Sequence, residues 1–327
     1  MTILVTGSAG HLGEALIRSL QAASRDCIGI DLKASPFTHR VGDISDRAFV
    51  RSAMRGVRAV IHAATLHKPH VATHPAQAFV DTNISGTLAL LEEAVSAGVE
   101  AFVFTSTTSV FGAALTPAPD APAAWITEEV APVPKNIYGT TKLAAEQLCE
   151  LFHRRHRLPV LILRAARFFP EADDDAAKRA AYELANAQAN ELLYRRADIA
   201  DVAEAHLLAV ERAPALGFGR YIVSATTPFA PEDLPLLHRD APAVLRRLFP
   251  AFEALYGSRH WRMFPRVDRV YVNALARRDL GWHPRHHFAQ VLACLAAGRD
   301  FRSPLALAIG AKGYHATAFG EMPYPVD

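Results

Sequence analysis

The stretch "ILVTGSAGHLGEALIRSL" at residues 3–20 decides the fold. A run of β-branched and aliphatic residues ends in a glycine, and the residues that follow Gly13 have the period of a helix. Gly7, Gly10 and Gly13 stand between them at intervals of three. Glycine permits a tight turn and the close approach of a diphosphate, to which the next helix offers free N–H groups and its positive dipole end. The stretch therefore predicts a strand, a dinucleotide-binding turn and a helix.

The same alternation of strand and helix continues to about residue 169. Further strands are predicted within residues 27–32, 59–65, 101–107 and 159–168, and helices around residues 46–56, 83–98 and 137–148. Strands that alternate with helices form right-handed βαβ units, hence a parallel sheet with helices on both faces. The predicted fold class is α/β, a doubly wound parallel sheet of the Rossmann type.

The pattern loosens after residue 169, which suggests two domains. We expect a Rossmann domain over residues 1–169 and a smaller C-terminal substrate-side domain over residues 170–327. Residues 196–226 contain a helical pattern followed by a strand pattern, so this segment is expected to return to the large sheet. Two short helices separated by proline are predicted within residues 230–257. The last stretch, residues 310–327, has neither period and is expected to be an irregular tail packed on the body.

Composition and charge limit the class of protein. A chain of 327 residues with 50% hydrophobic residues can bury a large core. Its formal charge of +2 comes from 35 basic and 33 acidic residues that are well mixed, so we expect neither a nucleic-acid nor a membrane partner. The sequence shows no cleavable leader and no run of about 18 apolar residues. We expect a soluble protein.

The cysteines and histidines argue against a disulfide framework and a metal site. Three cysteines, Cys27, Cys149 and Cys294, are odd in number and far apart, which fits a reducing cytoplasm best. His67, His70 and His74 could share a helical face. The segment "HKPHVATHP" carries two prolines, however, and no acidic partner stands at metal-site spacing. No metal is expected.

Asp31 indicates which dinucleotide the turn would bind. It stands eighteen residues after Gly13, at the end of the second predicted strand. A carboxylate in that place accepts the ribose hydroxyls of NAD and repels the additional phosphate of NADP. Lys33 could instead cover such a phosphate with its ammonium group. The sequence favours NAD.

Tyr138 and Lys142 stand four positions apart in a predicted helix. Their directions differ by about 40° around the helix axis, so the two side chains can converge on one point. Taken alone, the pair fits two side chains that lie along the surface with hydrated tips better than it fits a catalytic pair.

The order of motifs resolves this choice. The motifs are "TGSAGHLG" (6–13), "GDISD" (42–46), "HAAT" (62–65), "NISGT" (83–87), "TSTTSVFG" (105–112), "YGTTK" (138–142) and "RFFP" (167–170). In this order they resemble the extended short-chain dehydrogenase/reductases, the NAD-dependent epimerase/dehydratase group, over nearly the whole chain. The resemblance implies NAD as the cofactor and Thr107, Tyr138 and Lys142 as catalytic residues.

The resemblance also implies a role for each of these residues. Tyr138 would take the proton of a substrate hydroxyl while hydride passes to the nicotinamide, and Thr107 would hold that oxygen, a role that Ser106 or Thr108 could share. Lys142 would bind the nicotinamide ribose and, together with the oxidised ring, lower the tyrosine pKa. The implied cofactor residues are Gly7, Gly10, His11, Leu12, Gly13, Asp31, Asp43, Ile44, Ala63, Ala64, Asn83, Tyr138, Lys142 and Phe169.

Departures from the family pattern limit what can be said of the substrate. Thr108-Ser109 stands where dehydratases usually carry Asp-Glu, which disfavours dehydration, and Pro170 stands where sugar-nucleotide epimerases often carry asparagine. The insertion that usually binds the nucleotide also looks trimmed. The candidate substrate residues are Thr107, Thr108, Trp125, Arg266 and Arg269. The tryptophan could equally be a buried loop anchor, and the two arginines could equally form a solvated face.

The expected function is that of an NAD-dependent oxidoreductase or 4-epimerase acting on a sugar, which is expected to be nucleotide-activated. The alternatives are a dehydrogenase or reductase of a smaller non-nucleotide carbinol or ketone, and a non-catalytic dinucleotide sensor, for which the intact catalytic set would be superfluous. The resemblance further implies a homodimer through the helices at residues 85–98 and 139–155. Their apolar residues Leu88, Leu91, Leu143 and Leu148 are too many for one stripe, unless all of them pack on the sheet.

Overall fold

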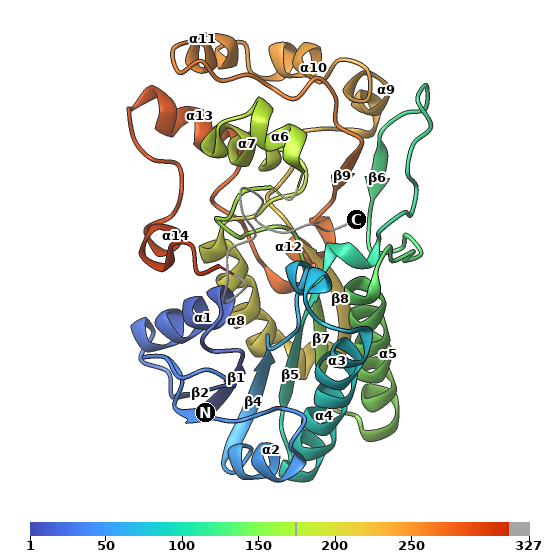
Figure 1. Ribbon diagram of the computed structural model, residues 1–327, viewed down its shortest axis with the longest axis vertical. Coiled ribbons are helices and arrows are strands. Elements are labelled where there is room, and N and C mark those ends of the chain that lie inside the picture. The colour runs from blue at the N-terminus through green and yellow to red at the C-terminus, as the bar shows by residue number, and fades with distance from the viewer. Residues whose placement is uncertain (174, 314–327) are drawn as a thin grey trace.

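The computed structural model describes residues 1–173 and 175–313, and its centre is a seven-stranded parallel sheet (Figure 1). The strand order is β3-β2-β1-β4-β5-β7-β8, and every adjacent pair is parallel. The strands are β1 (Thr2–Thr6), β2 (Cys27–Asp31), β3 (Arg40–Val41), β4 (Val57–His62), β5 (Ala101–Thr107), β7 (Val160–Ala165) and β8 (Phe218–Val223). The doubly wound parallel sheet predicted from the sequence is confirmed.

Helices cover both faces of this sheet. They are α1 (His11–Ala22), α2 (Arg47–Ala53), α3 (Ala76–Phe79), α4 (Gly86–Ala97), α5 (Ile137–His156), α8 (Ile199–Leu216), α12 (Ala274–Leu280) and α14 (Pro304–Ile309), with the shorter helices η1 (Lys68–Ala72), η2 (Val80–Ser85) and η3 (Thr108–Val110). Because the strands are covered on both faces, they read as continuous apolar runs; all six residues of β7 are buried.

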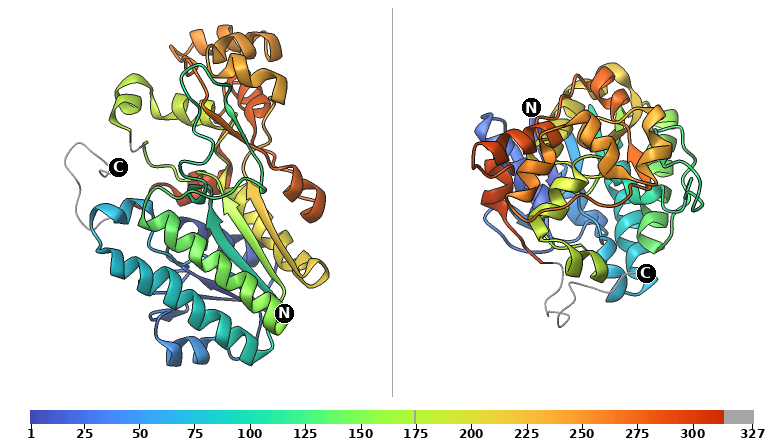
Figure 2. Two further views of the ribbon diagram at one scale, coloured as in Figure 1. Left: turned by 90° about the vertical axis from the view of Figure 1, so that its right-hand side faces the viewer. Right: turned by 90° about the horizontal axis from the view of Figure 1, so that it is seen from above.

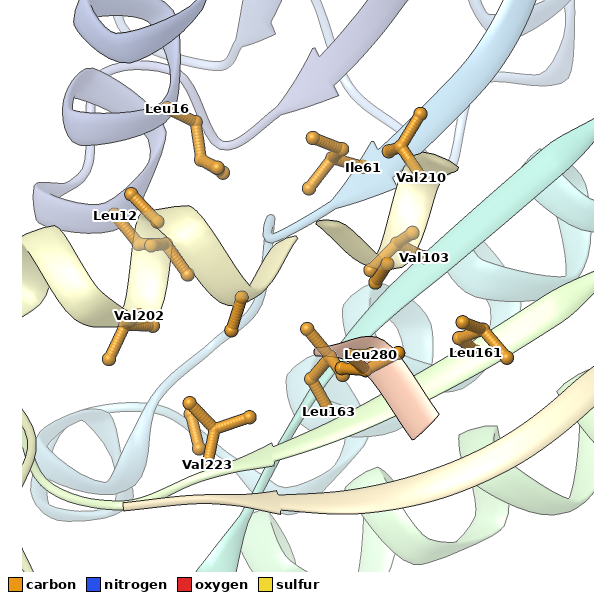
Figure 3. Packing of buried hydrophobic residues seen from close by; sticks show 14 of the residues in the cluster. Leu12, Leu16, Ile61, Val103, Leu161, Leu163, Val202, Val210, Val223 and Leu280 are labelled. Atoms are coloured by element: carbon orange, nitrogen blue, oxygen red, sulfur yellow. The ribbon is translucent and has the colours of Figure 1, made fainter. Parts of the chain in front are cut away.

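Two hydrophobic layers hold the helices to the sheet. On one face, α1, α8 and α12 pack on the strands; Figure 3 shows Leu16, Val202 and Leu280 of these helices beside Ile61 and Val103 of the sheet. On the other face, α2, α4 and α5 cover the same strands. These layers fix the carboxyl ends of the strands in relation to the loops that follow them.

The chain order reverses at β1, which pairs with β2 on one side and with β4 on the other. In open α/β sheets, ligands bind in the crevice at such a switch point. Gly7 ends β1 with φ +75°, and a Cβ there would lie 2.7 Å from the Ala64 backbone nitrogen. A Cβ at Gly13 would lie 1.9 Å from the Gly7 carbonyl oxygen, so α1 starts in direct contact with the turn. Side chains at either position would push these segments apart.

A smaller lobe stands on the carboxyl-end edge of the sheet (Figures 1 and 2). It consists of β6 (Ala124–Ile126), α6 (Ala176–Ala181), α7 (Leu184–Glu191), η4 (Pro231–Asp233), α9 (Leu234–Leu237), α10 (Ala241–Leu248), α11 (Phe252–Gly257), β9 (Arg269–Tyr271) and α13 (Phe288–Ala296). The strands β6 and β9 form a separate parallel pair. An aromatic-rich core that includes Phe252, Tyr256 and Phe288 holds the lobe together.

Two features of the later chain bear on the expectations from the sequence. Residues 230–257 contain α9, α10 and α11, so the prediction of two helices was wrong; Pro235 and Pro242 lie in the first turns of α9 and α10, where proline starts a helix. The helix and strand expected within residues 196–226 are α8 and β8, and β8 pairs with β7 at the sheet edge. The division into domains near residue 169 stays a prediction.

The irregular tail was expected over residues 310–327. The structure describes only the first part of it, residues 310–313, and the rest lies outside the described residues.

All three cysteines are free thiols. None of the helices in the described ranges combines the length and apolar character that a membrane span requires.

Candidate functional site

A cleft of about 1790 Å³ runs along the carboxyl ends of the strands and under the smaller lobe. Pockets for one small molecule usually enclose about 300–1,000 Å³. Most of the residues predicted from the sequence line it: Gly7, Gly10, His11, Leu12, Gly13, Asp31, Asp43, Ile44, Ala63, Ala64, Thr107, Thr108, Tyr138, Phe169, Arg266 and Arg269. Asn83, Lys142 and Trp125 do not. The cleft therefore has room for two ligands side by side.

The glycine turn forms one wall of the cleft and is tied to Asp31. The Asp31 carboxylate accepts hydrogen bonds from the Ala9 and Lys33 backbone N–H groups, at 3.0 and 2.9 Å. The N-cap of α1 is Gly10, which has no side chain to cap the helix. The first turn of α1 thus offers backbone N–H groups and a positive dipole end to an anion, with a fixed carboxylate beside it. This arrangement fits the diphosphate and ribose of a dinucleotide.

A second wall is the segment after β4. The Thr6 hydroxyl accepts hydrogen bonds from the backbone N–H groups of Ala63 and Ala64, at 3.1 and 3.0 Å. His62 is buried between Thr6 and Thr87, which lie 2.8 and 2.9 Å from its two ring nitrogens. Burial holds the pKa of His62 well below its ordinary value, so the ring is neutral. These bonds fix the Ala63-Ala64 backbone against the glycine turn.

Asn83 has a different place from the one predicted. Its side chain is buried in η2, a π-helical turn, and does not line the cleft. Its oxygen accepts from the Thr65 hydroxyl at 2.9 Å and the Leu66 N–H at 2.8 Å, and its amide donates to the Thr141 hydroxyl at 3.0 Å. Through these hydrogen bonds of its side-chain amide, Asn83 connects the loop after β4 to α5. It therefore supports the cleft wall from behind and does not form part of the lining.

Thr107 and Tyr138 meet inside the cleft. Thr107 ends β5, and Tyr138 lies in the first turn of α5, whose N-terminus is capped by the Asn136 side chain. The Thr107 hydroxyl lies near the Tyr138 phenol and favours its ionised form, and Thr107 accepts a hydrogen bond from the Ser109 N–H at 3.1 Å. The Tyr138 ring packs against His67, with centroids 5.0 Å apart. A phenol and an alcohol thus point to one place beside the nicotinamide end of the predicted cofactor cleft.

Lys142 is buried behind Tyr138 and does not line the cleft. Its Nζ lies 4.0 Å from the centroid of the Phe104 ring. Burial lowers the pKa of Lys142 to about 7, although the nearby Glu146 carboxylate opposes the shift. Burial raises the pKa of Tyr138, and only the nearby Thr107 hydroxyl counters it. In the chain without cofactor, desolvation therefore dominates the pKa of Tyr138. Its lowering by Lys142 together with the oxidised nicotinamide ring stays a prediction.

Glu146 is a buried residue of the site that the sequence reasoning missed. It accepts from the Ser106 hydroxyl at 2.5 Å and from Arg164 at 2.7 Å, and all three side chains are at most 3% exposed. These bonds join α5 to β5 and β7 directly beneath Thr107. The available signal was its spacing, since Glu146 follows Lys142 by four residues on the same helix face.

The other half of the cleft is aromatic and carries more basic than acidic side chains. Asp175 and Asp268 also line it, and Arg195 pairs with Asp173 and Glu191. Arg266 and Arg269 line this half; Arg266 is 64% exposed and lies 3.6 Å from Asp268, so it is also solvated. The sequence reasoning missed further lining residues: Lys178, Tyr182, Tyr194, Arg195 and Phe264. They come from the smaller lobe and its junction with the sheet, where no motif marked them.

Trp125 lies outside the cleft. It belongs to β6, pairs with Val270 of β9 and packs against the core of the smaller lobe. Of the two alternatives left open by the sequence, the structure supports the loop anchor. Among residues 1–173 and 175–313, no cluster of three or more His, Cys, Asp or Glu side chains could hold a metal ion.

The sequence of all seven strands of the sheet matches the model of one protein family. The model of the NAD-dependent epimerase/dehydratase family matches residues 3–223, from β1 to the end of β8. The chain belongs to the NAD-dependent epimerase/dehydratase family. As a member of this family it uses NAD, and the glycine turn, the fixed carboxylate and the uncapped helix start are the features that fit this cofactor.

Curated proteins that are similar to this chain match it over part of their length. A UDP-glucose 4-epimerase of Erwinia amylovora is 35% identical over 167 residues, 45% of this chain and 47% of that protein. An NAD-dependent glucose-6-phosphate dehydrogenase of Haloferax volcanii is 31% identical over 177 residues, 50% of this chain and 66% of that protein. The chain thus spans about half the length of the curated relatives that it matches.

Solved structures of this family resemble the chain over most of its length. A short-chain dehydrogenase/reductase superfamily protein from Agrobacterium tumefaciens, solved with bound NAD, has a TM-score of 0.63 at 24% identity; 91% of this chain and 96% of that chain are covered. The UDP-glucose 4-epimerase of Thermotoga maritima, solved with UDP-glucose, has a TM-score of 0.62 at 22% identity, with 89% and 96% covered. At these identities the likeness establishes the fold.

Proposed function

We propose that the protein is an NAD-dependent oxidoreductase or 4-epimerase that acts on a nucleotide-activated sugar. The observation that carries the proposal is the pairing of Tyr138 with Thr107 at the middle of a cleft with room for two ligands. One half of that cleft has the features of a dinucleotide site, and the other half is aromatic and carries more basic than acidic side chains.

In the proposed reaction, Thr107 holds a sugar hydroxyl and Tyr138 takes or returns its proton. The bound cofactor supplies a hydride acceptor and, in its oxidised form, a positive charge that favours the phenolate. Lys142 lies behind Tyr138 and would support the same state when protonated. Because burial raises the pKa of the tyrosine, these positive charges are needed for it to act as a base.

The basic half of the cleft supports a diphosphate-bearing substrate. Arg195, Arg266 and Arg269 line it, and Tyr182 and Phe264 offer aromatic faces for a base or sugar ring. The relatives of known name include a UDP-glucose 4-epimerase, which is consistent with such a substrate.

A dehydrogenase of a smaller, non-nucleotide sugar is the second candidate. In the described part of the insertion between β7 and α8, which leaves out residue 174, the only helices are the short α6 and α7. One relative is an NAD-dependent glucose-6-phosphate dehydrogenase. A smaller substrate would leave the basic end of the cleft to bind its phosphate.

One experiment distinguishes the two candidates. Purified protein is incubated with UDP-glucose and with glucose 6-phosphate at less than stoichiometric NAD, and the products are followed by NMR. Formation of UDP-galactose over many turnovers supports the epimerase. Product limited to the amount of NAD supports a net dehydrogenase, and no conversion of any sugar hydroxyl would contradict both.

A further inference from the structure

The end of the described chain returns to the glycine turn. Helix α14 packs on α1, and residues 310–313 continue from it to the cleft, which Lys312 and Gly313 line (Figure 1). The Lys312 ammonium donates a hydrogen bond to the Ala9 carbonyl oxygen at 2.8 Å, across 303 positions of sequence. A positive charge from the far end of the chain therefore lies at the turn where the cofactor's diphosphate is expected.

The ammonium also neutralises an acidic residue at this turn. Glu14 lies in the first turn of α1, only 7% exposed, and its carboxylate pairs with Lys312 at 2.6 Å and with Arg18 at 2.7 Å. Burial raises the pKa of Glu14, but the two cations outweigh this effect and lower it overall. A carboxylate beside a diphosphate site would repel the ligand. Lys312 offsets that repulsion.

The backbone of the same segment is held by Glu171. Its carboxylate accepts from the backbone N–H groups of Lys312 and Gly313, at 3.0 and 3.2 Å, and lies 2.8 Å from the His11 ring nitrogen. Glu171 belongs to the loop after β7, and His11 begins α1. Three segments from distant parts of the sequence thus meet at the diphosphate end of the cleft.

We propose that residues 310–313 form a clasp over the diphosphate end of the cleft, and that Lys312 and Glu171 set the rate at which NAD leaves. The inference rests on the proposed binding of NAD at the glycine turn. The ammonium attracts the diphosphate, and Glu171 holds the backbone of the clasp at the cleft edge. Slow release suits an enzyme that restores its NAD within each catalytic cycle, whereas a net dehydrogenase must exchange it.

The test measures release of the cofactor rather than turnover. Protein loaded with NADH is mixed with excess NAD in a stopped-flow instrument, and the loss of bound NADH fluorescence gives the release rate. Lys312→Ala and Glu171→Ala are each expected to release NADH about tenfold faster, the equivalent of about 1.4 kcal/mol. Lys312→Arg retains the charge and is expected to stay within about twofold of the wild type.

Two further variants serve as controls. Arg302→Ala removes a surface cation that pairs with Asp300 in the same part of the chain, and it should leave release unchanged. In the double variant Lys312→Ala with Glu14→Gln, the Glu14 carboxylate, which would then pair with Arg18 alone, is also removed. We expect this variant to recover part of the wild-type rate, because the repulsion from Glu14 is gone while the attraction by the ammonium is still missing.

The outcomes separate the clasp from the function on which it rests. Wild-type release rates in both Lys312→Ala and Glu171→Ala, with NADH still bound at the same site, would overturn the clasp and leave the proposed function intact. Failure of the wild-type protein to bind NADH would overturn both. Thermal unfolding of each variant shows whether the fold is retained, and the rescue by Glu14→Gln tests the electrostatic part independently of stability.

Discussion

Replacement of Tyr138 by phenylalanine tests the role of the Tyr138 hydroxyl without changing the packing of the ring. The ring is 4% exposed and packs against His67, and phenylalanine fills the same space. The change removes one hydroxyl and any hydrogen bond that it makes with the nearby Thr107, which keeps the Ser109 N–H as a partner. Loss of one neutral hydrogen bond costs about 1 kcal/mol of stability, whereas loss of a general acid–base group lowers the rate about 10² to 10⁴-fold.

The assay compares three quantities for Tyr138→Phe and the wild type. We expect turnover to fall by at least about 100-fold, while the dissociation constant for NAD and the midpoint of thermal unfolding stay nearly unchanged. Thr107→Val is the matched variant, since it keeps the phenol and removes the alcohol beside it. Retention of more than half the wild-type rate in Tyr138→Phe would refute the assignment of the proton-transfer role.

Three further predictions concern the cofactor, Lys142 and assembly. NAD should bind at least about tenfold more tightly than NADP, because two backbone N–H groups hold the Asp31 carboxylate in place; equal dissociation constants in calorimetry would show that Lys33 compensates. The pKa of Lys142 is lowered from 10.5 in the unfolded chain to about 7 in the folded chain. Between these two pH values the unfolded chain binds more protons than the folded chain, so the free energy of unfolding should rise with pH relative to that of Lys142→Met. A constant difference between the two proteins in urea titrations at pH 7 and pH 9.5 would contradict this. A homodimer through α4 and α5 is expected, and sedimentation of a stable species of 35.6 kDa at micromolar concentration would exclude it.

Most of the sheet and its order of helices were predictable because most of the strands are largely apolar runs; β3 was not, since it consists of only Arg40 and Val41. The strands β6 and β9 were not, because each has only three residues and they pair across more than 140 positions. Trp125 illustrates the consequence. Its place depends on that pairing, so the sequence left two alternatives of equal weight.

The site shows a similar division between local and distant contacts. The glycine turn and Asp31 were predicted from their places after the first strand and at the end of the second, whereas Thr107 and Tyr138 were implied by the family resemblance. Asn83 was predicted at the cleft wall, but its side chain accepts hydrogen bonds from Thr65 and Leu66. These residues belong to a loop that lies near Asn83 only in the folded chain. No local sequence pattern could predict that Lys312 lies at the glycine turn, because it is 303 residues away from Ala9 in the sequence.

The direction of the Tyr138 pKa also required the structure. A sequence gives the spacing of Tyr138 and Lys142 but not their exposure, and both side chains are at most 4% exposed. At that depth, desolvation raises the pKa of Tyr138 and lowers the pKa of Lys142 to about 7.

The most direct test of the central claim, that Tyr138 assists hydride transfer from a sugar hydroxyl to NAD in this cleft, is a single-turnover measurement. Protein loaded with one equivalent of NAD is mixed with excess UDP-glucose, and the absorbance of NADH is followed in the stopped flow. The account predicts that NADH forms rapidly in the wild type, transiently if the hydride returns to the sugar and stably if it does not, and at least about 100-fold more slowly in Tyr138→Phe at equal NAD occupancy. Equal rates in the two proteins would contradict it.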